Sequence, residues 1–203
     1  MSSVVAAPEV RVETPPHPFM RPGMMGMFIF LASEVMFFGS LFAMYFYMYS
    51  SHLNWPPSGT RAVSVFPLPT INTVILLTSG ATMHLSHVSI QRGDRRRYMI
   101  WLLVTIALGV AFEAGQAFEF ITAEIRFATN QFASAFFAMT GFHGLHVLGG
   151  LIFLSLVLYR SARGQFNAEH HVGVYACAIY WHFVDIVWVF LFAILYIGIA
   201  RVS

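Results

Sequence analysis

The chain has 203 residues, of which 58% are hydrophobic and only 10% charged, with a formal net charge of +2 and a mean hydropathy of +0.69. An ordinary soluble domain carries about a quarter charged residues, so this composition excludes that class and indicates an integral membrane protein. The basic residues are all arginines scattered along the chain, which argues against a nucleic-acid partner because such a partner requires a concentrated basic surface.

The first 23 residues differ from the rest of the chain. They contain the Pro15-Pro16-His17-Pro18 run and lack the basic-then-apolar layout of a cleaved signal peptide. We therefore expect a flexible N-terminal tail over residues 1–23, followed by one membrane domain over residues 24–203.

Five apolar stretches follow the tail, each long enough for the ~20 residues that a helix needs to cross a bilayer. They lie at about 24–49, 68–90, 98–122, 133–159 and 172–199. The segments between them are rich in Gly, Pro, Asn and Arg, which favour turns. The sequence thus predicts an all-α integral membrane protein, a bundle of five transmembrane helices.

The second stretch is more polar than the other four. Its polar side chains include Asn72, Thr73, Thr78, Ser79, Thr82, His84, Ser86 and His87. Polar groups within a bilayer need partners, so this helix is expected to face protein more than lipid.

The arginines divide unevenly between the two sides of the predicted bundle. Eight flank one side, namely Arg11, Arg21, Arg92, Arg95, Arg96, Arg97, Arg160 and Arg163, and three flank the other, namely Arg61, Arg126 and Arg201. Because arginine-rich segments stay in the cytoplasm, the N-terminus is predicted to be cytoplasmic and the C-terminus outside.

Ionisable residues within the apolar stretches are the candidate functional residues. They are Glu34, Glu113, Glu119, His143, His146, His182 and Asp185. One acidic residue at the centre of a membrane helix opposes insertion by roughly 2.5 to 3.5 kcal/mol, so these groups must be paired, protonated or solvated.

Their depths suggest particular pairs. Counting ~1.5 Å per residue from the cytoplasmic helix ends places His146 at the level of Asp185. The same count places His143 at the level of Glu113. Both pairs are expected across neighbouring helices.

From the residues alone, four interpretations of this polar set stay open. It is a structural hydrogen-bond network, a membrane metal site built from His and carboxylate side chains, a haem site with two axial histidines, or a proton pathway through Glu34 and Glu113. The single cysteine, Cys177, leaves no Cys-rich metal site among these choices.

Three strings in the predicted helices carry a family resemblance. Ser33-Glu34-Val35-Met36-Phe37-Phe38, Phe136 to Val147 (FFAMTGFHGLHV) and Tyr180 to Trp188 (YWHFVDIVW) resemble subunit III of haem-copper oxidases. Ile71-Asn72-Thr73 and Gly115-Gln116-Ala117-Phe118-Glu119-Phe120 are also similar to that family, over about residues 24–199. The longer members have seven helices, so this chain resembles the five-helix form.

The resemblance implies a non-catalytic subunit of a proton-pumping terminal oxidase in the bacterial cytoplasmic membrane, where oxygen is reduced to water. It implies direct packing on subunit I, further contacts with subunit II and other respiratory subunits, bound phospholipid, and haem and copper only in subunits I and II. Glu34 then corresponds to an intramembrane carboxylate placed toward subunit I. The residues His143, His146, His182 and Asp185 correspond to a polar bundle core, and none is catalytic.

The electron donor is less well determined by the motifs, since ubiquinol oxidases and nitric-oxide-reductase-associated relatives share several of them. Glu34 together with Gln116 and Glu119 favours cytochrome c as the donor. The alternative from another class is an autonomous metalloenzyme that binds metal through His143, His146, His182 and Glu113.

Overall fold

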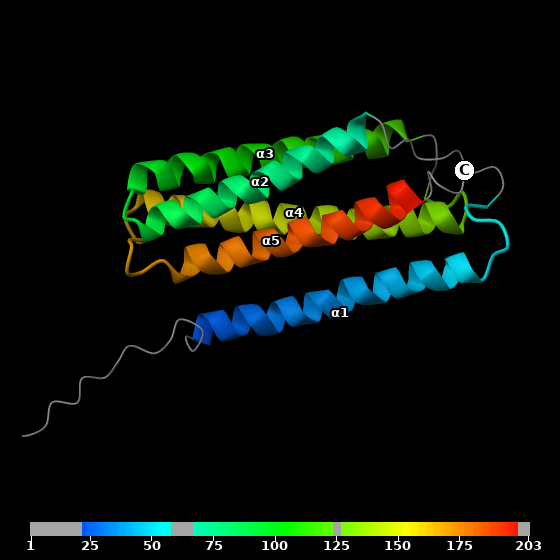
Figure 1. Cartoon of the computed structure of the whole chain (residues 1–203), viewed down its shortest axis with the longest axis horizontal. Helices are drawn as coiled ribbons and strands as arrows, with labels where there is room; N and C mark the ends of the chain where they lie inside the picture. Colours follow the sequence, from blue (N-terminus) through cyan, green and yellow to red (C-terminus); the bar gives the residue numbers. More distant parts are fainter. Residues whose placement is uncertain (1–21, 58–66, 124–126, 199–203) are drawn as a thin grey trace, which may run out of the picture.

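The computed structural model describes residues 22–57, 67–123 and 127–198, and this part of the chain is helical (Figure 1). Its helices are α1 (Pro22–Ser50), α2 (Leu68–Gln91), α3 (Arg95–Thr122), α4 (Gln131–Ala162) and α5 (Val172–Phe192). α5 continues into a short π-helical segment, η2 (Ala193–Ile197). The prediction of five helices is confirmed. Residues 1–21 of the expected tail lie outside the described residues, while Pro22 and Gly23 already belong to α1.

Side chains at two helix starts explain where the bundle turns. The Asp94 carboxylate accepts a hydrogen bond of 3.0 Å from the Arg97 backbone N–H at the start of α3, and the Asn130 side chain accepts one of 2.8 Å from the Ala133 N–H at the start of α4. Such caps satisfy backbone donors that have no partner within the helix. Between α2 and α3, Gly93 has a φ of +75°, which favours glycine and allows a tight reversal.

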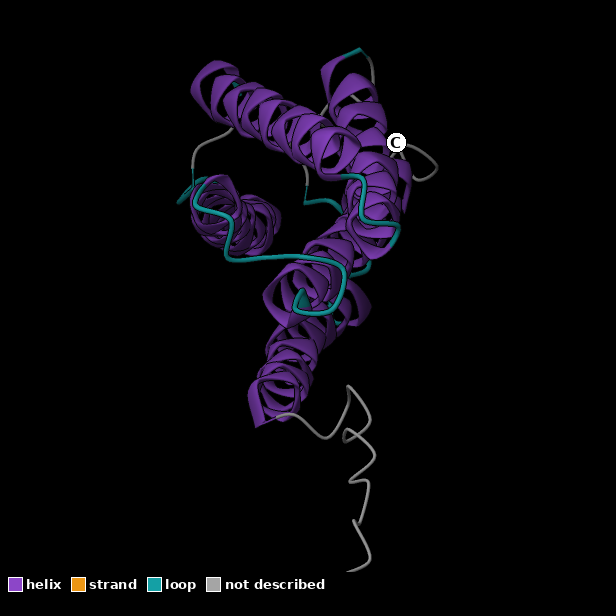
Figure 2. Cartoon of the chain, turned by 90° about the vertical axis from the view of Figure 1, so that its left-hand side faces the viewer, coloured by secondary structure: helices purple, strands orange, loops and turns teal. Residues whose placement is uncertain are grey.

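The helices form a four-helix unit and one outlying helix. α2 and α3 make an antiparallel hairpin, α3 packs on α4, α4 on α5, and α5 on α2. α1 packs on α4 and α5, and it lies along the lower edge of the molecule in Figure 1 and at the bottom of Figure 2. We call α2 to α5 the four-helix unit.

Four helices are long and apolar enough to cross a membrane: α1, α3, α4, and α5 together with η2. α2 falls below that hydropathy because of its polar side chains. Asn72, Ser79, Thr82, Ser86 and Ser89 are buried, while Ile71, Val74, Leu77 and Leu85 are exposed. One polar face of α2 therefore packs on protein, as predicted, whereas the predicted polar residues Thr78 and His84 are exposed.

Trp181 of α5 lies at the centre of the four-helix unit. Its indole packs against Gly109 of α3 and Gly150 of α4, where an added Cβ would come within 2.8 Å of the ring. Its Nε1–H donates a 3.0 Å hydrogen bond to the Ser79 hydroxyl of α2. One fully buried side chain therefore contacts all three of the other helices.

α1 is attached differently, through a narrow stripe. Its buried residues are Met24, Leu31, Phe38 and Tyr45, which follow one another at intervals of seven. A seven-residue repeat places side chains along one seam of a helix. The rest of α1 is largely exposed, including Ile29, Met36 and Tyr47, as expected for a helix surrounded by lipid or by another protein chain.

Candidate functional site: the intramembrane polar residues

Glu34 of α1 and His146 of α4 form a polar contact between α1 and the four-helix unit. The Glu34 Oε2 lies 2.8 Å from the His146 Nε2, and both side chains are only 17% exposed. Phe37 stacks near the imidazole at a centroid distance of 6.0 Å, and the Phe38 ring meets it edgewise at 4.9 Å. The pair therefore lies in an apolar, aromatic setting, where a charge interaction is stronger than in water.

The second ring nitrogen of His146 determines how the pair can hold a proton. His146 Nδ1 lies 2.6 Å from the Phe142 carbonyl oxygen, which can only accept, so Nδ1 carries a hydrogen. Nε2 then either donates to an ionised Glu34 or accepts from a protonated one. Either arrangement gives one hydrogen bond between the two side chains.

The structure corrects the expected pairing of His146 with Asp185. Asp185 instead faces α2, where its carboxylate packs directly over Gly80 in the position that a Cβ would occupy. Its Oδ2 lies 3.7 Å from His182 Nδ1 on the same helix. The prediction was wrong because the two side chains face different helices. α5 packs on both α1 and α2, and its Asp185 faces α2. His146 lies on α4 and faces α1.

The expected pair of His143 with Glu113 is also wrong. His143 is fully buried between the Trp188 ring, stacked at 5.0 Å, and the edge of Phe112 at 5.9 Å. Glu113 approaches α4 one residue further on, with Oε1 at 3.2 Å from the place of a Cβ on Gly144. Adjacent residues of a helix point in different directions, so similar depth did not bring the two groups together.

Glu119 has a partner that the sequence did not indicate. Its Oε1 accepts a 2.9 Å hydrogen bond from the Tyr196 hydroxyl, which η2 carries into the bundle. Another unexpected contact is the 3.0 Å hydrogen bond from Trp188 Nε1 to the Thr73 hydroxyl. The YWHFVDIVW string contains Trp188, but Tyr196 follows it without any motif of its own.

The seven candidates therefore do not form one centre. Glu34 and His146 meet, His182 and Asp185 are near each other, and Glu119 is bound by Tyr196, while Glu113 and His143 lie apart. Within the described ranges, the His, Cys, Asp and Glu side chains make no group of three or more that could hold a metal ion. The geometry is that of a set of local contacts between helices.

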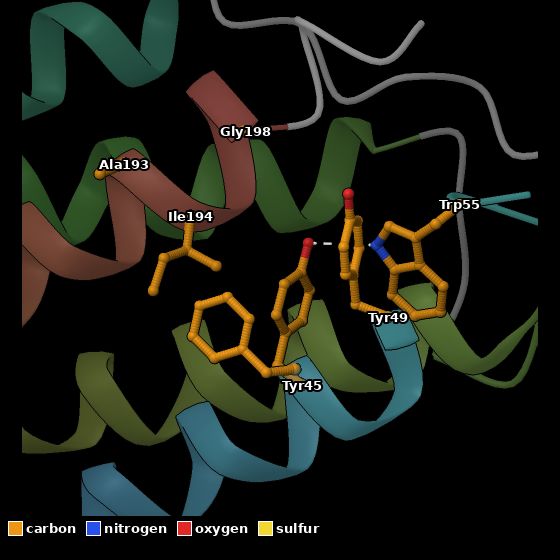
Figure 3. A pocket seen from close by; sticks show the side chains of 7 residues that line it. Tyr45, Tyr49, Trp55, Ala193, Ile194 and Gly198 are labelled. Carbon is orange, nitrogen blue, oxygen red and sulfur yellow. Dashed lines mark hydrogen bonds between the residues drawn. The ribbon is translucent and has the colours of Figure 1, made fainter. Parts of the chain in front are cut away.

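An aromatic cavity of about 320 Å³ lies at the C-terminal end of α1 (Figure 3). Its walls are Tyr45, Phe46, Tyr49, Trp55, Ala193, Ile194 and Gly198. The Trp55 Nε1–H donates a 3.2 Å hydrogen bond to the Tyr45 hydroxyl, and the two rings meet edgewise at 5.7 Å. Such a cluster of Tyr and Trp is typical of the level at which a membrane helix meets water.

The family model described as cytochrome c oxidase subunit III matches residues 15–199. The chain is 45% identical over 182 residues to cytochrome c oxidase subunit 3 of Thermostichus vulcanus, with 89% of each chain covered. It is 41% identical over 182 residues to the Synechocystis protein of the same name, covering 89% of this chain and 77% of that relative. The carp protein of that name, from Cyprinus carpio, is 42% identical over 176 residues, covering 84% and 67%.

Proposed function

This chain belongs to the cytochrome c oxidase subunit III family, and from that membership we propose that it packs directly on subunit I of a proton-pumping terminal oxidase. It is a membrane subunit of the enzyme complex rather than the site of oxygen reduction. Its role is to stabilise subunit I during turnover and to support proton uptake there.

The observation that carries the proposal is the separation of the polar residues. His146 is directed at Glu34 in α1, His143 at two aromatic rings, and His182 at Asp185 on its own helix. Each group contacts a different neighbour, as in a network that fixes helix positions. Family membership supports the further proposal that haem and copper are held by subunits I and II, and the separated polar residues give the alternative of an autonomous metalloenzyme no assembled ligand set within the described residues.

Glu34 has a position suited to a contact between subunits. Its carboxylate is held from inside by His146 while neighbouring residues of α1, among them Val35 and Met36, are 58% and 78% exposed. A partner helix that packs on this exposed face would lie beside a carboxylate already fixed in place. We propose that subunit I packs on this exposed face of α1, next to Glu34.

The orientation in the membrane follows from the arginines. Arg95 Nη2 donates to the carbonyl oxygens of Ser161 and Ala162 at 2.9 and 3.2 Å, so the α2–α3 and α4–α5 connections lie at one end of the bundle. This end carries Arg92, Arg95, Arg96, Arg97, Arg160 and Arg163. By the positive-inside rule, this arginine-rich end is the cytoplasmic end. Its positive charge suits contact with anionic phospholipid head groups. The membrane in this proposal is the bacterial cytoplasmic membrane.

Purification of an affinity-tagged chain from its native membrane in mild detergent tests the assignment. We expect co-purification with a haem-bearing subunit I and subunit II, and oxygen consumption driven by reduced cytochrome c. Oxygen consumption driven only by quinol would instead identify the chain as a subunit of a ubiquinol oxidase. Recovery of the chain without any haem-bearing partner would contradict the proposed function.

Substitution of Glu34 tests the supporting role more finely. In the purified complex, Glu34→Ala should leave the visible spectrum of the haems unchanged, because the chain ligates none of them, while the enzyme loses activity after fewer turnovers. A matched variant, Glu34→Gln, keeps the shape and the hydrogen-bonding capacity of the side chain and so separates the loss of the negative charge from a general change in α1. An altered haem spectrum in Glu34→Ala would contradict the supporting role.

A further inference from the structure

A groove opens on the outer surface between α2 and α5, at the middle of both helices. It has a volume of about 490 Å³ and is lined by Leu77, Gly80, Ala81, His84, Leu85, His182 and Asp185. α1 contributes no residue to it, so the groove is separate from the Glu34–His146 contact. Its shoulders are apolar, because Leu77 and Leu85 are 45% and 42% exposed there.

Asp185 forms the floor of this groove and lacks a full set of partners. Its side chain is only 10% exposed, and among the described residues neither carboxylate oxygen accepts a hydrogen bond. Oδ1 is covered, so Oδ2, which lies over Gly80, is the oxygen that a donor in the groove could reach. Its Oδ2 lies 3.7 Å from His182 Nδ1, which is too long for a hydrogen bond. The absence of a side chain at Gly80 is what lets the carboxylate lie between the two helices.

A buried carboxyl oxygen without a partner is costly, and the cost is greater at the middle of a membrane. Lipid tails cannot donate hydrogen bonds, and lipid head groups stay at the bilayer surface, far from the middle of α2 and α5. His84 is exposed at the rim and His182 is 41% exposed, so the groove presents several polar groups to its surroundings. These groups suit a protein neighbour with polar side chains of its own.

On the basis of the proposed function, we propose that the α2–α5 groove receives a transmembrane helix of another oxidase subunit, and that this helix brings a hydrogen-bond-donating side chain to Asp185. The Asp185 carboxylate is a hydrogen-bond acceptor without a partner, and the side chain of the second helix supplies the donor. Ala81, a small exposed residue of the groove, lets a second helix approach closely, and such close packing associates helices in lipid. The Glu34 face and this groove are then two different contacts of one subunit.

Photo-crosslinking in the intact complex tests this inference. A photoreactive amino acid at Ala81, an exposed residue of the groove, is activated in native membranes before the tagged chain is purified. We expect a covalent adduct with one other oxidase subunit, with the linked peptide lying in a membrane helix that contains a donor side chain. An adduct with lipid alone, or no adduct, would overturn the inference.

Removal of the carboxylate tests the part played by Asp185. In the Ala81 probe background, Asp185→Leu should lower the yield of the protein adduct about three- to tenfold, the range expected from the loss of one hydrogen bond between membrane helices. The matched control is Glu113→Leu, which removes an intramembrane carboxylate on α3 that faces Gly144 and not the groove. An equal loss in both variants would mean a general effect on folding and would overturn the role of Asp185.

The two proposals fail in different ways. If the tagged chain purifies with haem-bearing subunits but Ala81 gives no protein adduct, the groove inference falls and the proposed function stands. If no haem-bearing subunit is recovered at all, the proposed function falls first and takes the groove inference with it.

Discussion

The four-helix unit and α1 are held by different kinds of contact. The four-helix unit is joined by fully buried side chains that reach across several helices, above all Trp181, which contacts Gly109, Gly150 and Ser79. α1 is joined by a stripe of every seventh residue and by the Glu34–His146 pair. Since apolar burial gives little association between helices in lipid, packing and hydrogen bonds decide stability. The four-helix unit should therefore be the stable part of the subunit and α1 the part that separates first.

The largest expected effect comes from Trp181→Ala. Loss of the indole leaves a cavity between α3, α4 and α5 and removes the donor to Ser79, so unfolding of the subunit in detergent should become easier by about 3–5 kcal/mol. Phe190→Ala is the control, because Phe190 is 56% exposed and leaves no internal cavity. Equal unfolding free energies for the two variants would show that the four-helix unit is not organised around Trp181.

A smaller effect is expected from Gly80→Ala. The added Cβ would overlap the Asp185 carboxylate, and the forced shift should lower the unfolding free energy by about 1–3 kcal/mol. Gly141→Ala is the matched control, since no atom lies within 4 Å of a Cβ added at Gly141. That control should be neutral or slightly stabilising, because alanine favours a helix over glycine by about 1 kcal/mol. A similar loss in both variants would contradict the close approach of α2 and α5.

The attachment of α1 is tested by a double-mutant cycle on Glu34→Leu and His146→Leu. Each single change removes one side of the contact and should lower the unfolding free energy by about 1–3 kcal/mol, because the other group keeps a buried polar atom without its partner. The double variant should lose less than the sum of the two single losses. Strict additivity would show that the pair does not hold α1.

The smallest expected effect is that of Tyr196→Phe. It removes the hydrogen bond to Glu119, and hydrogen bonds between membrane helices contribute about 0.6 kcal/mol on average. Tyr47→Phe serves as the control, because Tyr47 is 73% exposed and its loss of a hydroxyl should not change the unfolding free energy. A loss in Tyr196→Phe as large as in Glu34→Leu would remove the distinction between internal polar contacts and those that hold α1.

Much of the fold could be predicted from the sequence because a bilayer requires long apolar helices. The predicted stretch at 133–159 lies within α4, and the inward polar residues of α2, such as Asn72 and Thr82, were expected from the cost of polar groups in lipid. The turn-favouring segments between the apolar stretches also fall between the observed helices. These features depend on local properties of the chain, which the sequence records directly.

The pairings within the site could not be predicted in the same way. A count of residues along a helix gives depth to about one turn, and it does not say which helices are neighbours. His146 was therefore assigned to Asp185, although α4 turns it toward Glu34. Tyr196 was missed because its contact with Glu119 depends on the π-helical segment η2, for which the sequence contains no signal that we recognise.

The seven-residue spacing of the stripe on α1 has a consequence for insertions and deletions. Seven residues complete nearly two turns, about 20° short, so Met24, Leu31, Phe38 and Tyr45 keep almost one direction along the whole helix. Insertion of one residue between Leu31 and Glu34 would rotate everything after it by about 100°, and would turn both Glu34 and Phe38 away from α4 and α5. Insertion of seven residues at the same place would restore the direction of the stripe but lengthen the helix by about 10 Å. The buried stripe therefore tolerates changes in the length of α1 only in multiples of seven residues. The thickness of the membrane limits the total length of the helix.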